Sequence, residues 1–121
     1  MIKSTLITAC MFFAGVLSAA SQQLKPFVVN GKWGYRDASD QVVVEPQYDM
    51  AFLFEEDMAL VILNNKTGFI DKTGKLIIPL KYDGAGNFSG GIAQVEINGK
   101  WGILDKSGKE ITSVKYNYIG K

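Results

Sequence analysis

Three aspartates recur in the sequence and are the first candidates for chemistry. Asp37, Asp71 and Asp105 lie 34 residues apart, and repeated carboxylates can act as general acids and bases or hold calcium. Each begins a turn-like segment in which an Asp side chain accepts backbone N–H groups. If three strands separate them, they lie about 14 Å apart at ~4.8 Å per strand, beyond the roughly 5–9.5 Å of glycosidase carboxylate pairs. We therefore interpret them as turn residues.

Nucleophilic and metal chemistry lack their usual side chains. The sequence contains no His, and its one Cys is Cys10. Without imidazole or thiolate there is no common base near pH 7, no thiol nucleophile and no zinc ligand set. No Gly-rich loop follows a strand and opens a helix, so nucleotide binding has no support. We predict no catalytic residue, metal or cofactor, and no enzymatic activity.

Aromatic residues are the better binding candidates. A series recurs at the same spacing and comprises Trp33, Trp101, Tyr48, Tyr82 and Tyr116. Such rings could form a platform for sugar rings or peptide side chains. Packing inside each repeat is the competing interpretation, and it is the one we favour.

One segment departs from the repeat. "FLFEED" (52–57) stands where the next copy reads "GNFSGG". Phe52 and Phe54 beside Glu55 and Glu56 could form an apolar anchor with an acidic rim for a protein partner. A loop tucked over one end of a barrel is the alternative, and the sequence leaves both open.

The first 20 residues have the pattern of a secretory signal. Lys3 precedes an apolar run of 15 residues, 6–20, which is shorter than the ~20 needed to span a bilayer. Ser18 and Ala20 place cleavage before Ser21, and a lipid on Cys10 is disfavoured because the apolar run continues past it. We predict export to the periplasm or the exterior, with no membrane span left after cleavage.

The remaining chain is electrically balanced. Removing Lys3 with the leader leaves 12 basic residues against 12 acidic residues. There is no basic excess to attract nucleic acid or anionic lipid. About 100 residues suit one domain with a modest core.

A shift of 34 residues aligns the chain with itself, and the turn residues indicate β structure. Apolar residues do not recur at helical spacing, which excludes helical repeats of similar period. Pairs at Asn30–Gly31 and Asn98–Gly99 predict type I′ hairpins, with Asn64–Asn65 a weaker version. "DKTG" (Asp71–Gly74) and "DKSG" (Asp105–Gly108) predict type I turns that end in a left-handed Gly.

The predicted fold is all-β, with three tandem antiparallel units of three strands in a domain over 24–121. The units are 24–57, 58–91 and 92–121, and a nine-residue loop precedes each later third strand. Residues 24–29 align with 58–63, so the first strand could seal the last unit into a closed barrel-like form; an open twisted meander is the alternative.

Two residue types mark special backbone positions in the units. Gly34 and Gly68 recur beside Trp33 and Thr67, and we expect a loop or an aromatic ring of the adjacent strand to approach these glycines closely. Pro46 and Pro79 cannot donate to a β ladder and are expected at edges or bends.

The motif order resembles the WG (KWG) repeat family. Lys-Trp-Gly, Asp-Lys-Thr-Gly, Lys-Tyr-Asp, Phe-Ser-x-Gly and Ala-x-Val occur in order within residues 24–121. The resemblance implies a bacterial, often exported protein of tandem β repeats with no catalytic residues to transfer. Thr67 in place of Trp and the "FLFEED" segment depart from the pattern.

These observations predict a non-enzymatic exported β-repeat module that binds a protein or peptide. Glycan binding on the Trp and Tyr series is the alternative, and no nucleic-acid partner is expected.

Export makes a direct prediction. Mass spectrometry of the exported protein should find an N-terminus at Ser21, because Ser18 and Ala20 suit signal peptidase. An N-terminal lipid on Cys10 would contradict this interpretation.

Overall fold

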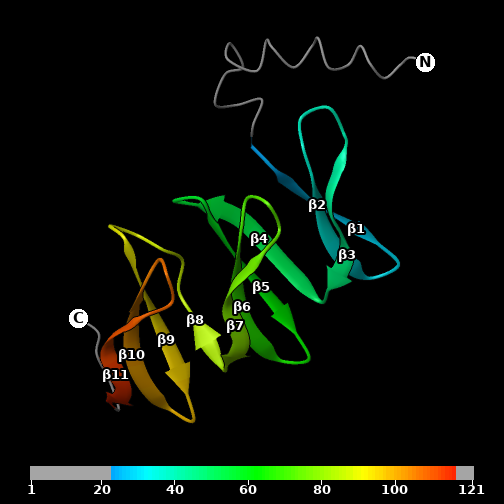
Figure 1. Cartoon of the computed structure of the whole chain (residues 1–121). Helices are drawn as coiled ribbons and strands as arrows, with labels where there is room; N and C mark the ends of the chain where they lie inside the picture. Colours follow the sequence, from blue (N-terminus) through cyan, green and yellow to red (C-terminus); the bar gives the residue numbers. More distant parts are fainter. Residues whose placement is uncertain (1–22, 117–121) are drawn as a thin grey trace.

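The computed structural model describes residues 23–116, and all regular structure in this range is β (Figure 1). The predicted signal at 1–20, its cleavage site and Cys10 lie outside the described residues. Residues 23–116 contain no helix long and apolar enough to cross a membrane. The strands in this range are β1 (Lys25–Val29), β2 (Lys32–Arg36), β3 (Val42–Tyr48), β4 (Met50–Glu55), β5 (Met58–Leu63), β6 (Lys66–Asp71), β7 (Leu76–Tyr82), β8 (Gly84–Ala85), β9 (Ile92–Ile97), β10 (Lys100–Asp105) and β11 (Glu110–Tyr116).

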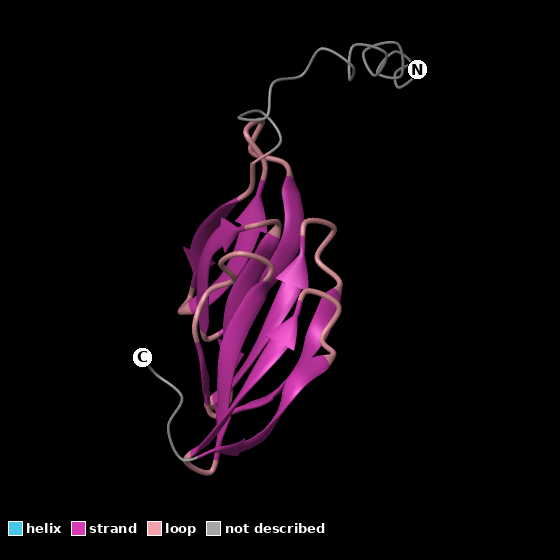
Figure 2. Cartoon of the chain, turned by 90° about the vertical axis from the view of Figure 1, so that its left-hand side faces the viewer, coloured by secondary structure: helices cyan, strands magenta, loops and turns pink. Residues whose placement is uncertain are grey.

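These strands form three antiparallel sheets. Sheet 1 has the order β1-β2-β3, sheet 2 the order β4-β5-β6-β7, and sheet 3 the order β8-β9-β10-β11. The sheets follow one another from the N-terminal to the C-terminal end (Figure 1), and a view turned by 90° shows them layered one behind another (Figure 2). The all-β prediction is confirmed.

The nine-residue loops of the sequence prediction are partly strand, which is a correction. Residues 50–55 and 84–85 form β4 and β8, the first strands of sheets 2 and 3. The N–H of Asp49 donates to the carbonyl of Ile62 at 2.8 Å, and pairing of β4 with β5 follows directly. Each later sheet therefore begins with a segment that the sequence assigned to the end of the preceding unit.

The first strand does not seal the last sheet. Among the described strands β1 pairs with β2 alone, and β11 pairs with β10 alone. Asn30 and Gly31 have φ of 50° and 82°, so a two-residue turn returns the chain directly into β2. Such a short loop costs little closure entropy. The closed arrangement is wrong, and the open alternative is confirmed.

Sheet 2 is the central layer and is covered on both faces. Along β5, Ala59 and Val61 join the core cluster shared with sheet 1, whereas Met58 and Leu60 join the cluster shared with sheet 3. A strand buried on both faces reads as a continuous apolar run, which explains "MALVIL" in β5.

The outer faces of the stack carry polar residues at some of the positions that are apolar inside it. Ala59 is fully buried between sheets 1 and 2, and its equivalent in sheet 1 is the exposed Lys25. Leu60 is 7% exposed between sheets 2 and 3, and its equivalent in sheet 3 is the exposed Gln94. Polar outer faces are typical of the terminal units of repeat arrays, and they let an open stack end in water.

A β-bulge recurs in each sheet. Trp33 lies opposite Tyr48, and Tyr35 lies opposite Val44, so the three residues 45–47 face the single Gly34 and arch out of the ladder. The same register shift occurs between β6 and β7 and between β10 and β11. Pro46 falls inside its bulge, where a ladder donor is not needed.

The recurring glycines lie beneath these bulges. A Cβ built on Gly34 would be 2.2 Å from the carbonyl oxygen of Val44, and one on Gly68 would be 2.5 Å from that of Ile78. No residue with a side chain fits such a contact without backbone movement. The expected close approach at Gly34 and Gly68 is confirmed, and the approaching group is the bulge backbone.

Gly68→Ala is expected to lower the free energy of unfolding by about 1–3 kcal/mol, because the new methyl group would overlap the backbone of β7. Gly86→Ala is the matched control, because its Cβ would meet no atom within 4 Å and the change should stay within about 1 kcal/mol. Urea denaturation of residues 21–121 measures both. Equal stability of the Gly68→Ala and wild-type proteins would contradict the contact.

Candidate functional site

The repeated aspartates complete turns. In Asp37, Asp71 and Asp105 one carboxylate oxygen accepts the N–H groups two and four residues later, at 2.8 to 3.1 Å. Hydrogen bonds from the hydroxyl groups of Thr73 and Ser107 lower the pKa of Asp71 and Asp105 further. These carboxylates are committed to their own backbone turns. Residues 23–116 contain no group of three or more acidic, His or Cys side chains that could hold a metal ion.

The described aromatic rings of the repeated series do not share one exposed face. Tyr48 and Tyr82 are 5% and 2% exposed and belong to the two cores, and burial raises the pKa of both. Trp33 and Trp101 are half-buried and lie in sheets 1 and 3, on opposite sides of the central sheet. The side chain of Tyr116 lies outside the described part of the structure.

The "FLFEED" segment is divided between core, inter-sheet contact and surface. Phe54 points into the core, with its ring 5.1 Å from that of Tyr35 in an edge-to-face contact. The two carboxylate oxygens of Glu56 accept the N–H groups of Gly90 and Gly91 at 2.6 and 2.8 Å. Phe54 and Glu56 are therefore structural, whereas Phe52, Leu53 and Glu55 remain exposed.

A bulge in β4 displays the exposed pair. Ala51 lies opposite Val61 and Phe54 lies opposite Ala59, so Phe52 and Leu53 together face one residue of β5. They are 39% and 61% exposed, and β4 is an edge strand of sheet 2.

Tyr35 holds this bulge from the neighbouring sheet. Its hydroxyl group donates to the carbonyl oxygen of Phe52 at 2.5 Å. Burial raises the pKa of Tyr35, so the phenol keeps its proton and stays a donor. The edge of sheet 2 is thus fixed by a side chain of sheet 1.

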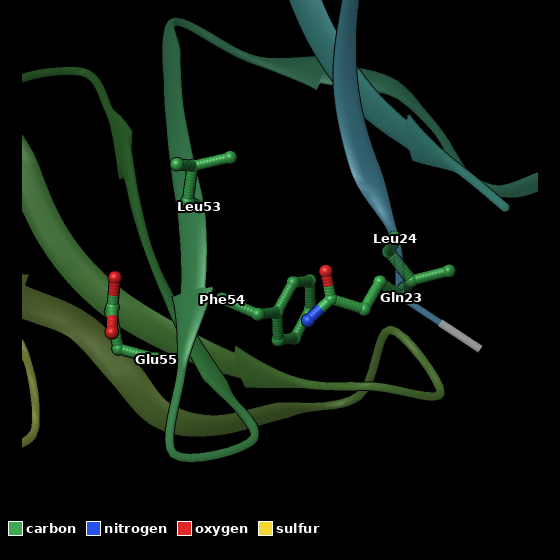
Figure 3. A pocket seen from close by; sticks show the side chains of 5 residues that line it. All are labelled: Gln23, Leu24, Leu53, Phe54 and Glu55. Carbon is green, nitrogen blue, oxygen red and sulfur yellow. The ribbon is translucent and has the colours of Figure 1, made fainter. Parts of the chain in front are cut away.

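Two hollows flank β4. The first, of about 310 Å³, lies between sheets 1 and 2 and is lined by Gln23, Leu24, Leu53, Phe54 and Glu55. In Figure 3 the Phe54 ring points toward Gln23, and Glu55 points to the other side of the strand. The second hollow, of about 320 Å³, lies between sheets 2 and 3 and has Phe52 in its wall. An exposed apolar edge between two hollows has the form of a binding site.

The sequence prediction missed two carboxylates that connect the sheets. Asp49 accepts the Nζ of Lys32 of sheet 1 at 2.6 Å and the N–H of Asn64 of sheet 2 at 2.9 Å. These hydrogen bonds hold the pKa of Asp49 below its ordinary value, and the bond from Lys32 contributes more than the bond from Asn64.

The same connection recurs between sheets 2 and 3. Asp83 accepts the Nζ of Lys66 at 2.6 Å and the N–H of Asn98 at 2.7 Å. These hydrogen bonds lower the pKa of Asp83, and the bond from Asn98 contributes more than the bond from Lys66. Recurrence of Lys, Asp and Asn at constant spacing was the signal in the sequence that could have found these residues.

Comparison with known protein families finds a repeat of the same length in this chain. A family model described as "WG containing repeat" matches residues 33–66, 68–101 and 101–121. Searches of curated proteins and of solved structures found no similar protein.

Acid should weaken the connections between sheets. Asp49 and Asp83 have pKa values below the ordinary 3.8, so their contribution to stability is present above that value. It is lost as the pH falls below about 4 through the folded-state pKa. The melting temperature of the wild type should therefore drop steeply in this range.

The double variant Asp49→Asn, Asp83→Asn should melt lower at pH 7 and lose less on acidification, because the two titrating groups are gone. Glu45→Gln, on the exposed bulge of β3, is the control for the loss of one negative charge and is compared with each single variant, Asp49→Asn and Asp83→Asn. An acid-induced drop as large in the double variant as in the wild type would refute the role of these carboxylates.

Proposed function

The chain belongs to the family of proteins with WG-containing repeats, and we propose that it is a non-enzymatic module that binds a protein or peptide partner along strand β4. The observation that carries the proposal is the bulge that exposes Phe52 and Leu53 on an edge strand between two hollows. Exposed apolar residues are ordinary singly, but a pair fixed on an edge strand beside hollows is typical of recognition surfaces.

The geometry favours an extended peptide as the ligand. An edge strand can add a peptide strand through main-chain hydrogen bonds, and pockets beside the strand then select alternate side chains. Leu53 and Phe52 would bury against apolar side chains of the partner. Glu55 is exposed at the end of the same strand, which favours a basic residue in the flank of the peptide.

The repeat positions of β4 support this choice. Gly86 and Asn87 occupy in sheet 3 the positions of Phe52 and Leu53, so the fold accepts small or polar residues there. Phe52 and Leu53 are therefore not required by the repeat itself. Glycan binding has less support, because Tyr48 and Tyr82 are buried.

The signal pattern of residues 1–20 supports a place for this module outside the cytoplasm. We propose that it meets its partner in the periplasm or outside the cell.

The test replaces Phe52 and Leu53 with the residue types that sheet 3 has at the same positions. Peptides selected from a random library on the wild-type domain should bind the variant Phe52→Gly, Leu53→Asn at least about tenfold more weakly, a loss of about 1.4 kcal/mol. Isothermal titration calorimetry measures the affinities, and melting curves show that the variant is folded.

Ile111→Asn is the matched control, because it removes an exposed apolar side chain (56% exposed) from sheet 3. It should leave peptide affinity unchanged. Selection of no peptide, or equal affinity for the β4 variant and the wild type, would refute the proposal.

A further inference from the structure

The hollow between sheets 2 and 3 lies where the repeat elsewhere carries an indole. Thr67 of β6 occupies the position of Trp33 in sheet 1 and of Trp101 in sheet 3. It precedes Phe69 by two residues on the same strand and therefore shares its face. The ring of Phe69 contacts that of Phe88, which lies between β8 and β9 of sheet 3, at 4.9 Å between centroids. The side chain of residue 67 thus faces the space between the two sheets.

The walls of this hollow combine apolar side chains, backbone and a few polar side chains, Asp83 among them. Leu60, Ile62 and Thr67 line it from sheet 2, and residues 83–87, which include β8, line it from sheet 3. Two of those residues are glycines, Gly84 and Gly86, so peptide planes rather than side chains form much of that wall. A space between apolar side chains on one side and peptide planes on the other suits a planar ring.

Two departures from the repeat are linked across this space. Sheet 2 combines the large Phe52 with the small Thr67, whereas sheet 3 combines the small Gly86 with the large Trp101 at the equivalent positions. Phe52 and Thr67 line the same hollow. The central sheet therefore has a threonine where the other two sheets carry an indole, and the aromatic ring of Phe52 lines the hollow of about 320 Å³.

We propose that this hollow binds an indole ring, which would lie against Phe52 and the backbone of residues 83–87. Asp83 lines the hollow with a side chain that is 33% exposed. Its carboxylate accepts Lys66 and Asn98 and has about four acceptor sites, so it can also accept the N–H of an indole. That acceptor distinguishes indole from phenyl rings.

The ring can come from a tryptophan of a bound peptide or from a free indole compound. Binding of a free ring does not depend on peptide binding along β4, so the two proposals can fail separately. One arm of the test therefore uses N-acetyl-tryptophanamide, and the other a tryptophan-containing peptide selected on the wild-type domain, together with its Trp→Ala form.

NMR titration up to about 10 mM ligand, in the millimolar range where weak ligands bind, should give saturable shifts of the amides of Gly84 and Gly86. Thr67→Val keeps the shape of the hollow and should bind as the wild type does. Thr67→Trp fills the hollow and should weaken binding at least about tenfold, or 1.4 kcal/mol. If only the peptide gives saturable shifts, and its Trp→Ala form binds at least about tenfold more weakly, the bound ring belongs to a peptide. If the free compound gives saturable shifts, the hollow binds the ring alone.

A second variant decides the matter if Thr67→Trp overpacks against Phe52 and does not fold. Phe52→Gly, Thr67→Trp reproduces the combination that sheet 3 already contains, and it should fold and lose ring binding. The proposal is overturned if neither arm gives saturable shifts with the wild type, or if a folded tryptophan variant binds within about twofold of it. Equal losses in Thr67→Val and Thr67→Trp would also overturn it.

Discussion

Face-to-face burial between small sheets is the constraint on which the structure depends. A sheet of three or four short strands cannot bury enough apolar surface alone, so each sheet needs a neighbour. Sheet 2 has one on both faces, and it contributes residues to both core clusters. The outer sheets have one neighbour each, and charged or polar residues such as Lys25 and Gln94 cover their other faces. Stacking therefore replaces closure as the way in which this chain completes its cores.

Polar contacts set the geometry of that stack, because apolar faces alone leave sheets free to slide. Asp49 and Asp83 each join a lysine of one sheet to a turn of the next. Glu56 adds a further connection from its position at φ 54°, a conformation that costs a residue with a side chain some strain. Its bidentate contact with Gly90 and Gly91 explains why a glutamate stands in a position that the next copy gives to glycine. Together these contacts fix the β4 edge relative to both hollows.

Much of this fold could be predicted from the sequence because its turns are chemically specific. Asn-Gly pairs and Asp-initiated turns located the hairpins, and Gly34 and Gly68 marked close backbone contacts. The short strand β8 contains only Gly84 and Ala85, which have low strand propensity. Because the repeat aligns β4 with this segment, β4 was also assigned to a loop. The sequence left the closed and open arrangements as alternatives, because the alignment of residues 24–29 with 58–63 shows which strands are equivalent without showing which strands pair. The candidate site was noticed as an irregularity, yet only the structure separated Phe54 and Glu56 from the exposed Phe52 and Leu53.

The linear order of the sheets has a consequence for how such proteins can diversify. Each sheet packs only on its neighbours in sequence, so duplication of one 34-residue copy would add one sheet and one interface without disturbing the others. The position of Thr67 carries an indole in the other two sheets, so the side chain there can differ from copy to copy. A gene that gains and loses copies could thus alter the number of spaces between sheets and the side chains that line them, while the polar residues at the ends of the array stay as they are.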